Sequence, residues 1–256
     1  MGQIKEQLQS IRERIARAAI DAGRRPSDVK LIAVSKYQPV AAIREAYAEG
    51  VRDFGENYVQ ELVSKAAELA DLHDLRFHLI GHLQTNKVKS VVGLVSVVHT
   101  VDSLRLADAI AARHSSSALS PAKRWPIAQS AATGCIESRG NDAKLPVFIE
   151  VNLGGEAQKS GCAPDETKEL LEGICARPEL RAVGLMTVPP YSEDPRASRR
   201  YFDLLRELRD RLATTVHLSE LSMGMTLDLE EAIAAGATVV RIGTAIFGER
   251  PRREVV

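Results

Sequence analysis

The sequence has no excess of charge of either sign. Its 34 lysine and arginine residues equal its 34 aspartate and glutamate residues in number, so the formal net charge is +0. Affinity for nucleic acid comes largely from basic side chains that neutralise phosphates. A neutral chain offers no electrostatic basis for such binding, and we expect no nucleic-acid partner.

Long apolar runs are also missing. No stretch approaches the ~18–20 apolar residues that a helix needs to cross a bilayer. The first residues, 1–23, are charged throughout, which is not the pattern of a secretory signal or a membrane anchor. We therefore expect a protein without a membrane segment.

Cysteine is scarce. The 3 cysteines, Cys135, Cys162 and Cys175, show no CxxC spacing and are odd in number. Disulfide frameworks and zinc sites use even counts or close pairs. The pattern favours free thiols in a reducing compartment, and the cytoplasm is the expected location.

Short apolar segments, in contrast, recur along the chain. Apolar residues spaced by three and four predict an N-terminal helix over about 4–18. Helical stretches then separate a series of short apolar segments that read as strands. The expected strands are 31–36, 53–56, 76–81, 95–102, 146–152, 180–188, 217–224 and 238–243.

This alternation predicts an α/β fold with a parallel sheet, and eight strands are the number that closes a (β/α)8 TIM barrel. The length of 256 residues fits that fold. We expect a single barrel domain over 1–256, with the N-terminal helix as an addition. A doubly wound open sheet is the alternative, but eight strand–helix units leave nothing over for a second architecture.

One segment, about 114–145, breaks the rhythm. It is rich in serine, proline and glycine and has no clear period, which predicts a long loop insertion. The loop would lie at the N-terminal face of the barrel, opposite the face where barrel active sites lie. We therefore interpret Trp125 within it as a surface anchor.

Lys36 stands at the end of the apolar segment 31–36. In a barrel, polar residues at the carboxyl ends of strands are the functional candidates. Desolvation there lowers the pKa of a lysine, so that its neutral amine can attack a carbonyl group. The alternative is a lysine that extends from the barrel mouth into solvent.

A second signal indicates a phosphate. The loops after the last two strands of a barrel commonly bind phosphate, and here they contain Ser222, Gly243 and Thr244. Glycine lets amide groups approach an anion, and hydroxyl groups can donate to it. Alternatively, the glycines only permit tight turns. A carbonyl-reactive lysine and a phosphate cradle together predict a phosphorylated aldehyde, pyridoxal 5'-phosphate (PLP).

Arg241 lies two residues before Gly243 and would point into the barrel. A buried guanidinium needs an acceptor. It could face the PLP ring nitrogen, where a permanent cation weakens the ring as an electron sink. It could equally pair with an inward acid such as Glu56 or Glu150. Both interpretations remain open at this point.

Seven ordered motifs between about residues 5 and 250 carry a family resemblance. They are AVSKYQP (33–39), FGENYVQE (54–61), FHLIGHLQTNK (77–87), VNLGGEAQKSG (151–161), GLMTVPP (184–190), LSMGMTLD (221–228) and VRIGTAIFGER (240–250). The sequence resembles the YggS/PROSC-type pyridoxal phosphate homeostasis proteins. These are related in fold to the N-terminal barrel of alanine racemase. Only the segment 114–145 interrupts the match.

The resemblance implies a role for each site residue. It implies that Lys36 holds PLP as a Schiff base and that Arg241 faces the ring nitrogen. The phosphate ligands would be Ser222, Gly243 and Thr244, and the residues flanking the ring would be Asn57 and Met223.

Two other motif pairs receive structural interpretations. His78 and His82 have a spacing that would place both on one face of a strand, but no third metal ligand accompanies them. We interpret them as structural or pocket-lining residues and expect no metal. Glu156 and Lys159 are expected to form a solvated charge pair rather than a second PLP contact.

The resemblance implies a carrier that buffers PLP or delivers it to PLP-dependent apoenzymes, without catalytic turnover. The alternative is a weak PLP-dependent amino-acid racemase. Racemisation needs a base on each face of the substrate, and Lys36 serves only one. We expect the additional C-terminal β-domain of racemases to be absent, because the chain ends at Val256. A barrel that binds another phosphorylated metabolite is a third possibility. We expect a monomer.

Overall fold

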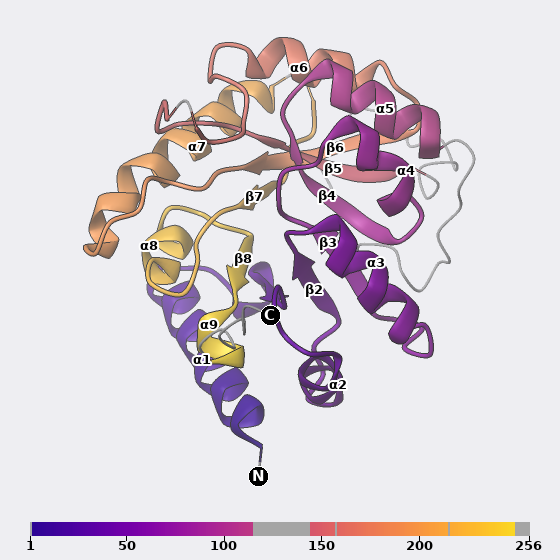
Figure 1. Ribbon diagram of the computed structural model, residues 1–256. Coiled ribbons are helices and arrows are strands. Elements are labelled where there is room, and N and C mark those ends of the chain that lie inside the picture. Colours follow the sequence, from indigo (N-terminus) through magenta and orange to yellow (C-terminus); the bar gives the residue numbers. More distant parts are fainter. Residues whose placement is uncertain (1, 115–143, 157, 215, 249–256) are drawn as a thin grey trace.

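The computed structural model describes residues 2–114, 144–156, 158–214 and 216–248. Over these ranges the parallel strands pair in chain order, and β8 pairs back with β1 to close a barrel (Figure 1). The predicted (β/α)8 architecture is confirmed. The strands are β1 (Lys30–Val34), β2 (Asp53–Glu56), β3 (Arg76–Leu79), β4 (Val95–Val101), β5 (Leu145–Glu150), β6 (Leu180–Met186), β7 (Glu220–Ser222) and β8 (Val239–Ile242).

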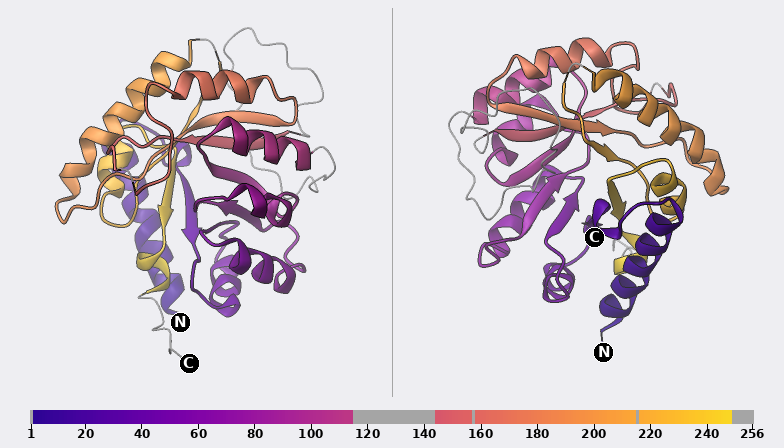
Figure 2. Two further views of the ribbon diagram at one scale, coloured as in Figure 1. Left: turned by 45° about the horizontal axis from the view of Figure 1, so that its top comes forward. Right: turned by 180° about the vertical axis from the view of Figure 1, so that it is seen from behind.

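Helices connect the strands and lie outside the barrel (Figure 2). Within the described ranges, none of them is both long and apolar enough to span a bilayer. The α-helices are α1 (Gln3–Asp21), α2 (Val40–Ala48), α3 (Val59–Glu68), α4 (Val88–Val91), α5 (Leu104–His114), α6 (Thr167–Cys175), α7 (Arg199–Leu212), α8 (Leu229–Ala234) and α9 (Thr244–Phe247). Short 3-10 turns lie at Pro26–Asp28, Thr85–Lys87 and Pro195–Ser198.

Helix α1 is the predicted addition to the barrel. Its apolar residues recur at helical spacing and form one buried stripe, made of Ile4, Leu8, Ile11, Ile15, Ala18 and Ala19. This stripe packs against α2, α8 and α9, and Figure 1 shows α1 running beside the last two. The helix thus covers the join between the first and last strands of the barrel.

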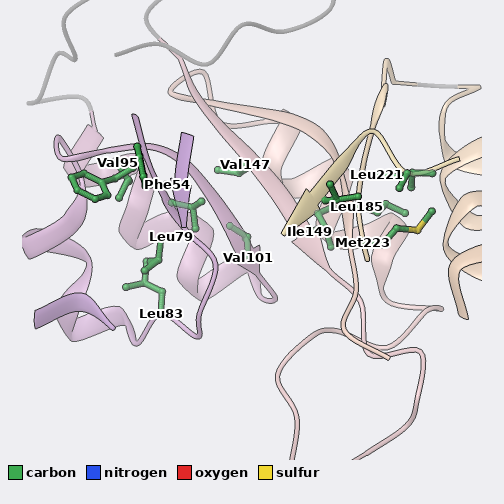
Figure 3. Close-up of a cluster of buried hydrophobic side chains, with 14 of the residues drawn as sticks. Phe54, Leu79, Leu83, Val95, Val101, Val147, Ile149, Leu185, Leu221 and Met223 are labelled. Atoms are coloured by element: carbon green, nitrogen blue, oxygen red, sulfur yellow. The ribbon is translucent and has the colours of Figure 1, made fainter. Parts of the chain in front are cut away.

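The two faces of the strands carry two separate apolar clusters, because successive side chains of a strand point to opposite sides. The larger cluster fills the space between strands and helices and includes Phe54, Leu79 and Ile149 (Figure 3). The smaller cluster has the opposite strand parity and lies toward the barrel axis: Ile32, Val97, Phe148, Val183, Met186 and Val239. Polar side chains complete the interior, among them His78, His99, Ser222 and Arg241, all buried.

Seven of the eight strands are shorter than predicted, and only β2 has the expected bounds. The sixth ends at Met186 rather than at residue 188, because the prolines that follow, Pro189 and Pro190, have no N–H for a ladder. The seventh is limited to Glu220–Ser222, and Gly224 turns the chain with a φ of 93°. The predicted loop insertion follows the end of α5 at His114. Its residues 115–143, including Trp125 and Cys135, lie outside the described residues.

The stripe of α1 yields a prediction. Leu8 is 0% exposed. Replacing it with alanine leaves a cavity, and we expect Leu8→Ala to lower the free energy of unfolding by about 2–5 kcal/mol. Urea denaturation measures this. Lys5→Ala on the exposed side of the same helix is the control and should change stability by less than about 0.5 kcal/mol. Equal effects of the two substitutions would contradict the assigned face.

Candidate functional site at the barrel mouth

The predicted site residues come from four adjacent strands. In the closed barrel β7 neighbours β8, β8 neighbours β1, and β1 neighbours β2. Lys36 follows β1, Asn57 follows β2, Ser222 ends β7, and Arg241 lies in β8. Since the strands are parallel, their carboxyl ends meet at one mouth of the barrel. The fold therefore brings these residues to the same end.

Gly243 lies directly against the end of β1. A Cβ atom at this position would be 3.2 Å from the carbonyl oxygen of Val34, two residues before Lys36. Thr244 follows and begins α9, and its side chain is exposed at the mouth. The first amide groups of a helix have no partner within the helix. The predicted phosphate ligands of this turn thus stand beside the end of the strand that leads to Lys36.

Lys36 is flanked by two residues whose backbone is held in place. Tyr37 has a left-handed conformation with a φ of 63°, and its N–H donates to Glu61 Oε1 at 2.6 Å. On the other side, the carbonyl of Ser35 accepts from Lys65 Nζ at 2.6 Å. A left-handed non-glycine residue is unfavourable unless its surroundings enforce it. Two residues of α3 therefore fix the chain before and after Lys36.

The anchor beneath Lys36 is a buried ionic cluster. Lys65 Nζ lies 2.8 Å from Glu56 Oε1 and 2.7 Å from Glu61 Oε1. The Ser35 hydroxyl also donates to Glu56, at 2.7 Å. Burial raises the pKa of Glu56, while Lys65 and Ser35 oppose that shift. Glu56 thus pairs with Lys65, so Glu56 is not the partner of Arg241.

Arg241 has no carboxylate partner in the described part of the chain. Its Nη1 donates to Ser222 Oγ at 2.6 Å and its Nη2 to the Thr187 carbonyl at 3.0 Å. Burial lowers the pKa of Arg241 to about 10, which leaves the guanidinium charged at neutral pH. Glu150 attracts this cation without forming an ion pair with it within 4.0 Å. The contacts favour a guanidinium that is held for a ligand over one neutralised by an acid.

Glu150 ends β5 and is also buried. Its Oε2 atom has no hydrogen-bond partner. Burial and the neighbouring Asp102 raise the pKa of Glu150 to about 7, with Arg241 opposing. This carboxyl group therefore exchanges its proton near neutral pH.

Asn57 and Met223 occupy different environments. The Asn57 side-chain oxygen is buried and has no hydrogen-bond partner, so it can still accept from a ligand. The Met223 side chain is fully buried in the cluster between strands and helices, near Leu221 and Leu185 (Figure 3). A contact of Met223 with a bound ring stays a prediction, and its main chain would have to provide it.

The expectation that His78 and His82 lie on one face of a strand was wrong. Strand β3 ends at Leu79, so His82 lies beyond it, exposed and 3.0 Å from Ser160 Oγ. His78 points inward and is fully buried. Across the described ranges, no three metal-binding side chains cluster. The expected ion pair between Glu156 and Lys159 is confirmed.

Sequence reasoning missed His99. It lies in β4, stacks on Phe148 with ring centroids 4.3 Å apart, and has its Nδ1 3.0 Å from Ser222 Oγ. The only signal was its inward parity within an otherwise apolar strand. Thr187 lies near the end of the predicted sixth strand, among the strand-end candidates, but its role as the backbone acceptor for Arg241 leaves no trace in the sequence.

The chain thus forms a closed parallel barrel with Lys36 after its first strand and the Gly243–Thr244 turn after its last. The model of the family described as alanine racemase, N-terminal domain, matches residues 7–251. Among curated relatives, the pyridoxal phosphate homeostasis protein of Aquifex aeolicus is 44% identical over 247 residues, covering 96% of this chain and 97% of that protein. That of Pseudomonas aeruginosa is 44% identical over 250 residues, covering 98% and 97%. The chain belongs to the pyridoxal phosphate homeostasis protein family.

A solved structure agrees with this assignment. PipY of Synechococcus elongatus, in the structure with PLP bound, is 34% identical and superposes with a TM-score of 0.76. The match covers 96% of this chain and 100% of PipY. Similarity therefore extends over the whole barrel in both sequence and fold.

The ionic anchor yields a prediction. Lys65→Met removes the cation from two carboxylates and leaves Glu56 buried without an ion pair, so we expect unfolding to become easier by about 3 kcal/mol. Thermal or urea denaturation measures the loss. The double variant Lys65→Met/Glu56→Gln removes the stranded charge and should recover most of the stability. A double variant as unstable as the single one would show that Glu56 is not the main partner.

Glu150 yields a pH-dependent prediction. Its pKa is raised from 4.5 to about 7 in the folded protein. The protonated carboxyl therefore contributes stability that is present below pH 4.5 and lost as the pH rises through 7. Relative to Glu150→Gln, the wild type should lose about 2–3 kcal/mol between about pH 5 and 8. Denaturation at both pH values tests this, with the exposed Glu172→Gln as control. A constant difference between wild type and Glu150→Gln would contradict the buried environment of Glu150.

Proposed function

We propose that this protein binds PLP at the barrel mouth and holds it on Lys36, as a carrier that takes part in PLP homeostasis. The observation that carries the proposal is the placement of Lys36, anchored on both sides and two residues after Val34, against which Gly243 packs. The names of the relatives and the PLP-bound PipY structure support the same ligand. We further propose a single domain over 1–256.

The residues at the mouth fit the parts of PLP. Lys36 provides an amine for the aldehyde, and Gly243, Thr244 and Ser222 provide donors for the phosphate. Arg241 would face the ring nitrogen, and Asn57 offers an unpartnered acceptor beside the ring. When bound, PLP supplies an electrophilic aldehyde and a ring that can accept electrons.

The environment of the ring nitrogen favours holding PLP over transforming a substrate. Arg241 remains charged and is fixed by Ser222 and Thr187. A cation at this place discourages protonation of the ring nitrogen and so weakens the electron sink that most PLP chemistry uses. We therefore propose a carrier without catalytic turnover, located in the cytoplasm and monomeric, whose partners are PLP-dependent apoenzymes.

Weak amino-acid racemase activity is the second candidate, favoured by one observation. The Tyr37 ring lies 5.1 Å from that of Tyr58, and Tyr37 is adjacent to Lys36, so a phenol stands near the lysine. A tyrosine can act as the second base that racemisation requires. Racemase assays of the PLP-loaded protein with several amino acids decide between carrier and enzyme. Turnover that disappears in Tyr37→Phe would favour the enzyme.

The PLP site itself is tested with Lys36→Ala. We expect a visible absorption band when PLP is added to the wild type, loss of that band in Lys36→Ala, and a borohydride-reduced adduct that maps to Lys36 by mass spectrometry. Lys159→Ala is the matched control, because Lys159 is half-buried, ion-paired with Glu156 and predicted to play no part in the site. The same band in wild type and Lys36→Ala would show that PLP modifies other lysines and would refute the proposal.

A further inference from the structure

A continuous chain of buried hydrogen bonds crosses the barrel interior and ends on Ser222. His99 Nδ1 lies 3.0 Å from Ser222 Oγ, and its other ring nitrogen, Nε2, lies 3.0 Å from His78 Nδ1. His78 Nε2 in turn lies 3.1 Å from Asp53 Oδ1. The side chains of His78, His99 and Ser222 are all 0% exposed. Bulk water therefore does not reach these three side chains.

Two ionised groups fix the ends of this chain. Asp53 accepts from Arg76 Nε at 2.6 Å and Nη2 at 2.8 Å. Burial by itself would raise the pKa of Asp53, but the hydrogen bonds from Arg76 and His78 outweigh it and lower the pKa to about 2. Asp53 is thus a carboxylate that only accepts. At the other end, Arg241 only donates, to Ser222 at 2.6 Å.

Because Arg241 can only donate and Asp53 can only accept, every hydrogen bond between them donates toward Asp53. Burial lowers the pKa of both histidines, so each is neutral and carries a single N–H. His78 must use its N–H at Nε2, toward Asp53, so its Nδ1 accepts from His99 Nε2. His99 Nδ1 then has no proton and accepts from the Ser222 hydroxyl. Ser222 therefore gives its only proton to His99.

This direction conflicts with a phosphate ligand at Ser222. A hydroxyl that donates to His99 has no proton left for an anion. Ser222 can donate to a phosphate only if the hydrogen bonds between Ser222, His99 and His78 reverse, and that reversal requires one more proton. That proton comes from water and is held by His78, which then donates from Nε2 to Asp53 and from Nδ1 to His99. His99 donates from Nδ1 to Ser222, and Ser222 is free to donate to the anion.

We propose that His78 and His99 are positioning residues for the phosphate, and that the pair takes up one proton when a phosphorylated ligand binds at Ser222. This inference rests on the proposed function. It adds that binding of the phosphate is linked to pH and that the Ser222 hydroxyl reverses only when the histidine pair has taken up a proton.

The other charges around the pair make this uptake depend on the ligand. Arg76 from β3, Lys30 from β1 and Arg241 from β8 all disfavour a further positive charge on the two histidines. Lys30 is paired with Glu220 of β7 at 2.7 Å, and Glu150 of β5 attracts Arg241 without an ion pair. Asp53 favours a charge on His78, but burial and these cations outweigh it, so the pair stays neutral until an anion adds negative charge at the mouth.

The test compares pyridoxine 5'-phosphate with pyridoxine, which have the same ring and no aldehyde, so that neither needs a covalent bond to Lys36. Above about pH 7.5 the phosphate is already a dianion, because its second pKa is about 6. Uptake of one proton by the protein should then make the preference for the phosphorylated ligand rise about tenfold for each unit that the pH falls, between about pH 8.5 and 7.5. Calorimetric titration measures both affinities.

Two variants and one spectrum complete the test. Ser222→Ala should abolish the pH dependence of the preference, whereas Thr244→Ala should weaken binding of the phosphorylated ligand and keep that dependence. In ring-nitrogen NMR spectra of the wild type, both histidines should carry hydrogen on Nε2 without ligand, and His78 on both nitrogens with pyridoxine 5'-phosphate.

A preference that does not change with pH, or unchanged tautomers in the complex, would overturn the inference. If PLP also fails to bind Lys36, the proposed function falls with it. If PLP binds Lys36 normally, only the proton linkage is refuted.

Discussion

The N–H groups of a cation buried inside a closed barrel need hydrogen-bond acceptors within the barrel. Much of this site follows from that constraint. Arg241 lies on the inner face of β8, where no carboxylate among the described residues forms an ion pair with it. Its donors are accepted by the hydroxyl of Ser222 and the carbonyl of Thr187. Ser222 is in turn held by His99, His99 by His78, and His78 by Asp53. Arg241, Ser222, His99, His78 and Asp53 are thus one connected network, which is satisfied only as a whole.

The lysine is positioned by different means, from outside the barrel. Lys65 and Glu61 belong to α3, and they hold the backbone on both sides of Lys36. The strand end that carries Lys36 is therefore held through the backbone of its two neighbours, Ser35 and Tyr37. Arg241 is oriented by polar groups inside the barrel, and Lys36 is oriented by helix α3 outside it. Gly243, packed against β1, brings the two arrangements to the same edge of the barrel.

The sequence predicted the parts of the site that depend on local pattern. Alternating strands and helices placed Lys36, Asn57, Ser222 and Gly243 at strand ends, because that placement needs only the strand count and direction. The pattern could not reveal the anchor, since Lys65 reads as one more charged residue on an amphipathic helix. His99 was hidden for a related reason: it stands in a run of valines whose burial suggested packing rather than hydrogen bonding. The spacing of His78 and His82 wrongly predicted that they share one face of a strand, because β3 ends before His82.

The most direct measurement is a crystal structure of the protein with PLP added. The account predicts continuous electron density between Lys36 Nζ and the ligand, with the phosphate at the Gly243–Thr244 turn and the ring nitrogen facing Arg241. Density for PLP on another lysine, or an Arg241 side chain turned away to pair with Glu150 in the complex, would contradict it.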